Sequence, residues 1–176
     1  INWWNKHLEY LNIENIGAYS HDQVLVAQTF GRDTGFICAG CDAEEKLKDI
    51  LVYGIPESLE TINKLEAEVM SCLKREKRCI VLMSEGLFSK NLVNSRDLAG
   101  QIQYSSGSSS SAQYFASYLN KKGINSRSII PASLQRVFQS EVIDYDRELA
   151  FAQGYQCSKS ILEGDKEFLI SINRNR

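Results

Sequence analysis

Three short apolar runs separated by helix-like segments constrain the fold of this chain most strongly. The runs cover residues 24–27, 49–55 and 79–83, and each has the length and β-branched content of a buried strand. The third run is apolar throughout, as expected when helices cover both faces of a sheet. Because strands that alternate with helices form parallel sheets, we predict a three-layer α/β/α fold with a doubly wound, mostly parallel sheet.

Helical periodicity and turn residues place the other expected elements. Ser58 can cap a long helix that carries Leu65 and Val69 on one face, and Gly123 and Gly164 close two later helices. Helices are expected over residues 1–12, 35–47, 58–75, 112–122 and 146–162, a connection over 12–19, a turn over 131–136, and strands over 127–130 and 167–172.

A polar segment over residues 88–111 interrupts this alternation. It contains the serine-rich run 105–111, which is typical of a flexible surface loop. A run of glycine and serine can also surround a phosphate group, but a P-loop needs a lysine at fixed spacing, which this run lacks. We therefore expect a loop.

The composition is ordinary for one soluble globular domain. A chain of 176 residues can bury one good core, so we expect a single α/β region over residues 1–176. The net charge of −2 does not indicate the basic surface that binds nucleic acid, and no apolar run has the length of a membrane span. The start lacks the pattern of a signal peptide, and Ile1 opens inside a helix-like pattern without Met. We expect a piece of a longer cytoplasmic protein.

The five cysteines are expected to be free thiols of a reducing compartment. Cys38 and Cys41 have the spacing of a metal or redox pair, but neither a second pair nor a nearby histidine completes a zinc site. Metal or redox use of this pair is the less favoured alternative.

Glycines and charged side chains gather where the expected strands end. Gly31 and Arg32 follow the first strand, Glu85 follows the third, and Arg127 and Arg136 flank a later turn. Arginine forks bind phosphate oxygens in bidentate fashion, and a carboxylate accepts hydrogen bonds from hydroxyl groups, so this set suits a sugar phosphate. The alternative is that each arginine forms a surface ion pair worth less than about 1 kcal/mol.

Motifs of other enzyme classes are absent from the sequence. It contains neither G-x-S-x-G nor G-x-G-x-x-G nor a Walker pattern, and His7 and His21 are its only histidines. His21 precedes a strand in a turn, where a local hydrogen bond is favoured over the role of a general base.

Five separated segments resemble the phosphofructokinase family in order and in spacing. The SHDQ…FGR stretch is similar to its SH-x-R…GR-x-x-G segment, and IPE and LMSEG are similar to two of its strand ends. RSIIPASLQR resembles its R-x-x-x-LG-[HY]-x-QR turn, and YDR…LEG resembles the helix that follows this turn. These segments lie at residues 20–32, 55–57, 82–86, 127–136 and 145–164 and cover essentially the whole chain.

The resemblance implies a binding site for fructose 6-phosphate. Arg127 and Arg136 would clamp its phosphate group, one of them reaching in from a neighbouring subunit. The implied substrate-binding residues are Phe30, Gly31, Arg32, Glu85, Arg127 and Arg136.

The chain departs from the family pattern at several of these positions. Gln23 stands where the family usually has a phosphate-binding arginine, which gives up a charge-assisted hydrogen bond of about 1.5–3 kcal/mol. Ser133 replaces histidine or tyrosine, and Phe30 replaces methionine. Gln23 and Ser133 are therefore only possible members of the site. These variants and the long polar loop favour the pyrophosphate-dependent or atypical bacterial branch over the ATP-dependent one.

The resemblance also indicates what the chain lacks. The family's GGDG donor loop and its T-[IV]-D-N-D segment, which carries the catalytic base, do not occur in the sequence. No catalytic residue and no ligand of the implied Mg²⁺ is therefore expected in this chain, which alone should be inactive.

We expect part of an oligomeric, glycolytic 6-phosphofructokinase, with pyrophosphate or ATP as the phosphoryl donor. Two alternatives remain open: a non-catalytic module that binds or responds to a sugar phosphate, and a generic doubly wound domain. A generic doubly wound domain predicts that Arg32, Glu85 and Arg136 do not face one pocket.

Overall fold

A computed structural model describes residues 1–41, 47–58, 61–92, 95–96, 98–103, 110–137 and 142–171. The chain forms two compact units, residues 1–137 and residues 138–176. No helix among the described residues has the length and apolar character needed to cross a membrane.

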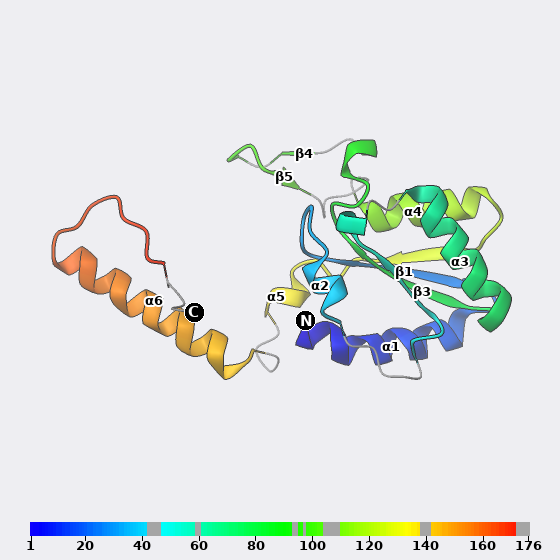
Figure 1. The fold of residues 1–176 in the computed structure, drawn as a ribbon, viewed down its shortest axis with the longest axis horizontal. Helices are drawn as coiled ribbons and strands as arrows, with labels where there is room; N and C mark the ends of the chain where they lie inside the picture. The colour runs from blue at the N-terminus through cyan, green and yellow to red at the C-terminus, as the bar shows by residue number, and fades with distance from the viewer. Residues whose placement is uncertain are drawn as a thin grey trace. The chain divides into compact units, whose positions relative to one another are not determined.

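The first unit is built on a sheet of four parallel strands in the order β2-β3-β1-β6 (Figure 1). The strands are β1 (Val24–Thr29), β2 (Leu51–Gly54), β3 (Cys79–Ser84) and β6 (Ser126–Ile129). Strands β1 and β3, at the centre, are buried along their whole length, because helices cover both faces. This confirms the predicted parallel α/β fold.

Helices cover the two faces of the sheet (Figure 1). Helices α1 (Asn2–Ala18) and α2 (Phe36–Ala39) lie on one face, where Gly40 at the end of α2 contacts Ile1. Helices α3 (Ile62–Glu76) and α4 (Ser111–Lys121) lie side by side on the other face, where Tyr118 and Lys122 both bond to Glu66. The predicted three layers are therefore present.

Helix α1 is longer than expected, because its buried face continues through a polar residue. Leu8 and Leu11 are buried, and Asn15 follows them on the same face with 1% of its surface exposed. The side-chain nitrogen of Asn15 donates to the carbonyl of Gln23, and its side-chain oxygen accepts from Arg78. Both polar atoms of the buried side chain therefore have hydrogen-bond partners. The prediction of a connection over residues 12–19 was wrong for residues 12–18 for this reason.

The N-cap of helix α3 lies three residues after the predicted cap, Ser58. Thr61 is its N-cap and its hydroxyl oxygen accepts a hydrogen bond from the Lys64 amide at 3.2 Å. Ser58 instead ends a short 3₁₀ helix, η2 (Pro56–Ser58), where its hydroxyl donates to the carbonyl of Ile55. Both serine and threonine can cap a helix, so the sequence alone did not decide between them.

The polar segment after β3 contains more structure than a flexible loop. It holds η3 (Ser89–Asn91) and an antiparallel hairpin of β4 (Ser95–Arg96) and β5 (Ile102–Gln103). At its end, Ser110 and Ser111 are buried, and the Ser110 side chain caps α4. Most of the serine-rich run, residues 105–109, lies outside the described residues.

Two further expectations differ from the structure. Helix α2 ends at Ala39, and residues 42–46 of the expected helix over 35–47 lie outside the described residues. In the turn expected over 131–136, a short helix α5 (Leu134–Val137) forms.

The second unit contains the helix α6 (Asp144–Leu162). The strand predicted over residues 167–172 is wrong for residues 167–171, which form no strand. Glu167 has a φ of 57°, which interrupts an extended backbone, and no strand is present in the described part of this unit to pair with the segment. Residue 172 lies outside the described residues.

Candidate functional site

The two central strands end side by side and their connections leave to opposite faces. Thr29 of β1 pairs with Ser84 of β3 at the carboxyl edge of the sheet. The chain then passes from β1 to α2 on one face, and from β3 to α4 on the other (Figure 1). Ligands of doubly wound sheets bind in the crevice that such a divergence creates. The loops after β1 and β3 therefore form the candidate site.

The loop after β1 has a backbone that favours glycine at its first turn. Gly31 has a φ of 133°, and a Cβ there would lie 2.5 Å from the carbonyl oxygen of Thr34. Arg32 follows with a φ of 51°, a left-handed conformation that costs an arginine about 1–3 kcal/mol. The surrounding contacts must hold this loop in place.

The last residue of β3 and the two residues that follow it provide those contacts. A side-chain oxygen of Glu85 accepts a hydrogen bond from the Arg32 amide at 3.1 Å. The Arg32 carbonyl accepts from the Gly86 amide and from the Ser84 hydroxyl, both at 2.9 Å. The loop that carries Arg32 is therefore bonded along its backbone to the end of the neighbouring strand.

Glu85 is itself fixed from the opposite side. Its side chain is among the buried charged groups, with 6% of the residue exposed. The Ser111 hydroxyl, at the start of α4, donates to the Glu85 carbonyl at 2.7 Å. A buried carboxylate therefore lies beside the exposed Arg32 at the carboxyl edge of the sheet.

A second arginine approaches from the turn after β6. The Arg136 guanidinium lies over the ring of Phe30, with 4.4 Å between its central carbon and the ring centroid. Such a cation–π contact is worth about 0.5–1 kcal/mol at an exposed site. Because Phe30 precedes Arg32 by only two positions, the contact brings Arg136 to the loop after β1.

Gln135 holds this turn against the site. Its side-chain oxygen accepts from the Phe30 amide at 3.2 Å and from the indole nitrogen of Trp4 at 2.8 Å. Gln135 thus ties α1, the end of β1 and α5 together. No local pattern in the sequence indicates this role, although Gln135 directly precedes Arg136 in the RSIIPASLQR segment.

Glu57 is another residue that the sequence analysis assigned no role. Both of its carboxylate oxygens lie 2.8 Å from the Gly35 amide at the start of α2. A Cβ at Gly35 would lie 2.3 Å from the Ile55 side chain, so a glycine is needed for this close approach. The only earlier signal was the IPE segment that ends the second strand.

The structure thus brings together Phe30, Gly31, Arg32, Glu85 and Arg136. Ser133 lies in the same turn as Arg136, exposed, and its carbonyl accepts a hydrogen bond from the Arg136 amide at 2.9 Å.

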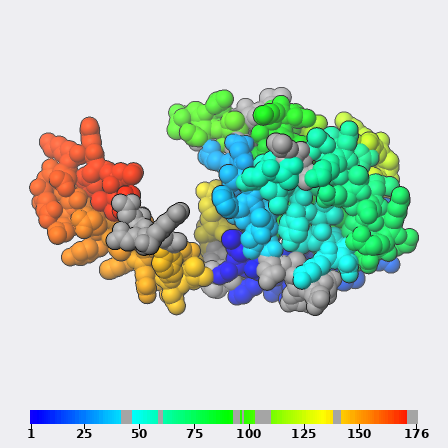
Figure 2. Space-filling model, viewed as in Figure 1, coloured from blue at the N-terminus to red at the C-terminus, as the bar shows by residue number. Residues whose placement is uncertain are grey.

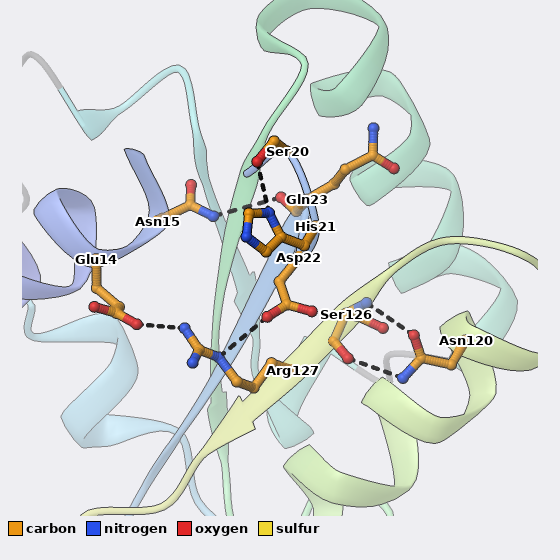
Figure 3. A network of polar contacts seen from close by, with 9 residues as sticks. All are labelled: Glu14, Asn15, Ser20, His21, Asp22, Gln23, Asn120, Ser126 and Arg127. Carbon is orange, nitrogen blue, oxygen red and sulfur yellow. Dashed lines mark hydrogen bonds and ion pairs between the residues drawn. The ribbon is translucent and has the colours of Figure 1, made fainter. Parts of the chain in front are cut away.

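Arg127 and Gln23 lie at the opposite edge of the sheet (Figure 3). Arg127 pairs with Leu25 near the start of β1, and it forms ion pairs with Glu14 and with Asp22. Gln23 precedes the strand. Six residues of strand span about 20 Å, so within one chain neither side chain belongs to the crevice.

Comparison with known proteins identifies the family. The family model for phosphofructokinase matches residues 5–161. The chain belongs to the phosphofructokinase family. Among curated proteins, no match was found.

Two solved structures of pyrophosphate-dependent phosphofructokinases have a similar fold. The protein from Nitrosospira multiformis has a TM-score of 0.57 and 23% sequence identity, and the match covers 86% of this chain and 36% of that one. The protein from Marinobacter aquaeolei has a TM-score of 0.61 and 18% identity, and the match covers 94% and 39%. The present phosphofructokinase-family chain therefore spans less than two fifths of either relative, and at these identities the likeness concerns the fold.

The cysteine pair of this phosphofructokinase-family chain retains its protons. Burial raises the pKa of the Cys38 thiol to about 12 and that of Cys41 to about 11. The Cys41 thiol donates to the carbonyl of Ile37, and Cys38 contacts the Thr29 hydroxyl. Both cysteines are free, as the sequence analysis expected.

A surface hollow of about 310 Å³ lies away from the crevice. It is found where α1 and α3 end, near the amino ends of the strands, so none of the crevice residues lines it. Its lining residues are Ile16, Tyr19, Glu76, Lys77 and Arg78.

Proposed function

We propose that this chain supplies the fructose 6-phosphate side of a phosphofructokinase active site. The observation that carries the proposal is the bond between the Arg32 backbone and the Glu85 carboxylate, at the point where the connections of β1 and β3 diverge. It joins a phosphate-binding residue type to a hydroxyl-binding one in a single crevice. The order of the strands alone brings positions 32 and 85 together; the presence of an arginine and a glutamate at these positions is what favours a sugar-phosphate site.

Each crevice residue has a role in this proposal. The Arg32 and Arg136 guanidinium groups bind the phosphate oxygens, since their planar forks match the geometry of that group. Glu85 accepts hydrogen bonds from sugar hydroxyl groups. Gly31 lets the substrate approach the backbone closely, and Phe30 packs beside the sugar.

We further propose that Arg127 acts on the site of a neighbouring subunit. Its place at the amino ends of the strands separates it from the crevice of its own chain. Glu14 and Asp22 hold the side chain at the surface, where 42% of it is exposed. Gln23 lies at the same edge and would reach the same neighbour with a neutral amide.

The parent enzyme would transfer a phosphoryl group to the 1-hydroxyl of fructose 6-phosphate and produce fructose 1,6-bisphosphate in cytoplasmic glycolysis. We favour pyrophosphate over ATP as the donor, because both structural relatives are pyrophosphate-dependent enzymes by name. Phosphoryl transfer depends on positioning and on neutralisation of charge. This chain would position the acceptor.

The donor and the base would bind and act elsewhere in the enzyme. In the part of the chain that the structure describes, no three His, Cys, Asp or Glu side chains gather in a way that could hold a metal ion. We propose that residues outside this chain hold the Mg²⁺, together with the donor loop and the catalytic base that the resemblance places there. The isolated chain is proposed to bind substrate without turning it over.

Calorimetric titration with fructose 6-phosphate tests the proposal. The Arg32→Ala variant should bind at least tenfold more weakly, because it loses a charge-assisted bond of about 1.5–3 kcal/mol. Arg75→Ala is the matched control: Arg75 ends α3 at the other edge of the sheet, bonded to the carbonyl of Asp49. Inorganic phosphate reports how much of the affinity comes from the phosphate group alone.

Equal affinities of the parent chain, Arg32→Ala and Arg75→Ala would contradict the proposal. Restoration of phosphoryl transfer on mixing this chain with the donor half of a related enzyme would favour the catalytic role. Saturable binding without such restoration would favour a sugar-phosphate-binding module.

A further inference from the structure

The hairpin after β3 is a second structural element at the proposed site. Strands β4 and β5 pair antiparallel, with Ser95 opposite Gln103 and Arg96 opposite Ile102. In Figures 1 and 2 the hairpin, in green, lies above the blue loop that follows β1. It extends from the polar segment that the sequence analysis treated as a loop.

Two described residues of the hairpin, Arg96 and Gly100, are bonded to each other. Gly100 has a φ of 77°, a conformation that suits glycine, and its carbonyl accepts a hydrogen bond from the Arg96 side chain at 2.6 Å. Gln101 comes next, directly before β5. Its position is therefore set by the pairing of the hairpin and by the Arg96 bond.

Gln101 contacts Arg32, one of the two arginines proposed to bind the phosphate group in this crevice. The Arg32 Nη1 atom donates to the Gln101 side-chain oxygen at 3.0 Å. Since 69 positions separate the two residues in the sequence, the contact exists only because the hairpin folds back to the end of β1. The backbone of Arg32 is fixed by β3, and its guanidinium end by the hairpin.

Orientation of an exposed arginine before binding favours affinity. A free arginine side chain has high rotamer entropy, part of which is lost when a ligand immobilises it. A contact that already restricts the side chain in the free protein reduces this cost. The acceptor is a neutral amide, so it directs the guanidinium without placing another negative charge beside a phosphate group.

We propose that the β4–β5 hairpin is a positioning arm of the sugar-phosphate site, in which Gln101 orients the Arg32 guanidinium toward the anion. The inference rests on the proposed function, because it deepens the role of Arg32 in binding fructose 6-phosphate. Gln101 is a positioning residue: it acts through Arg32.

Two substitutions of Gln101 and a matched control test the proposal. Gln101→Met keeps the length of the side chain and removes the acceptor, and should weaken binding of fructose 6-phosphate about fivefold, which corresponds to one hydrogen bond. Gln101→Glu adds a negative charge beside the phosphate, and its loss of affinity should shrink as salt screens that charge. Gln113→Met, at an exposed position of α4, should leave affinity unchanged.

A spectroscopic measurement in the same proteins reports on the contact itself. Nitrogen NMR signals of the Arg32 side chain, assigned with Arg32→Lys, should differ between the parent and Gln101→Met and should match between the parent and Gln113→Met. Unchanged Arg32 signals in Gln101→Met would overturn the proposal, and so would unchanged affinity with altered signals.

The two proposals fail in distinguishable ways. If the parent chain does not bind fructose 6-phosphate, the proposed function is contradicted. The same comparison run with inorganic phosphate still decides the role of Gln101: a phosphate-induced shift of Arg32 signals that needs Gln101 supports the positioning role, and an equal shift in Gln101→Met refutes it.

Discussion

Replacement of Gly86 by alanine should separate the loops that form the crevice. A Cβ at Gly86 would lie 2.1 Å from the carbonyl oxygen and 2.5 Å from the carbonyl carbon of Arg32. Both are backbone atoms, so no side-chain rotation relieves the clash. The Arg32 loop must move by about 0.9 Å to reach even the 3.0 Å limit of real contacts.

This displacement has two costs. Overpacking at a rigid position destabilises a protein by about 1–3 kcal/mol. The movement also stretches the hydrogen bond of 2.9 Å from the Gly86 amide to the Arg32 carbonyl, and the net loss of such a bond is about 1 kcal/mol. We expect Gly86→Ala to lose about 2–4 kcal/mol of unfolding free energy and to bind fructose 6-phosphate much more weakly.

Gly17→Ala is the matched control for this substitution. Gly17 lies in α1, and a Cβ at this position would have no neighbouring heavy atom within 4 Å, so the same change removes only the entropy cost of a helical glycine. It should stabilise the chain by up to about 1 kcal/mol. Urea unfolding of both variants measures the difference, and a Gly86→Ala variant as stable as the parent would refute the close approach of the two loops.

Three further predictions concern the groups that support the site. Glu57→Gln should destabilise the chain by about 1 kcal/mol in urea unfolding, because a neutral amide replaces the charged acceptor of the Gly35 amide. Ser111→Ala should cost about 1–3 kcal/mol, since its buried hydroxyl bonds to both Glu85 and Phe88, whereas the exposed Ser158→Ala should cost almost nothing. The Cys38 thiol ionises near its ordinary pKa of 9 in the unfolded chain and only at a pKa of about 12 in the folded one. Its contribution to the free energy of unfolding should therefore be fully present below pH 9 and decrease as the pH rises from about 9 to about 12. The Cys38→Ala variant should lose less unfolding free energy as the pH rises above 9, which urea unfolding at pH values below and above 9 measures. An equal loss in both proteins would contradict the raised pKa of Cys38.

The sequence was sufficient to predict elements whose residues repeat a simple pattern. Strand β3 is apolar over residues 79–83 and was predicted to within one residue, since a strand covered by helices on both faces is rich in apolar side chains. Helix α1 was predicted too short because Asn15 is a buried polar residue whose partners lie elsewhere in the chain. An apolar pattern alone did not make a strand of residues 167–171, because a strand also needs a neighbour to pair with.

The candidate site was predictable where its residues follow strands directly. Gly31, Arg32 and Glu85 could be placed together because parallel strands end at one edge of a sheet. Gln101 and Gln135 could not, since they contact the end of β1 from 69 and 105 positions away. Such contacts depend on how a hairpin and a turn fold back, which local patterns do not encode.

A crystal structure of this chain grown with fructose 6-phosphate tests the central claim most directly. We predict density for the sugar phosphate in the crevice outside β1 and β3, with its phosphate group at the Arg32 and Arg136 side chains and a sugar hydroxyl at Glu85. Density at another surface of the same chain, with the crevice residues unchanged and solvated, would contradict the account.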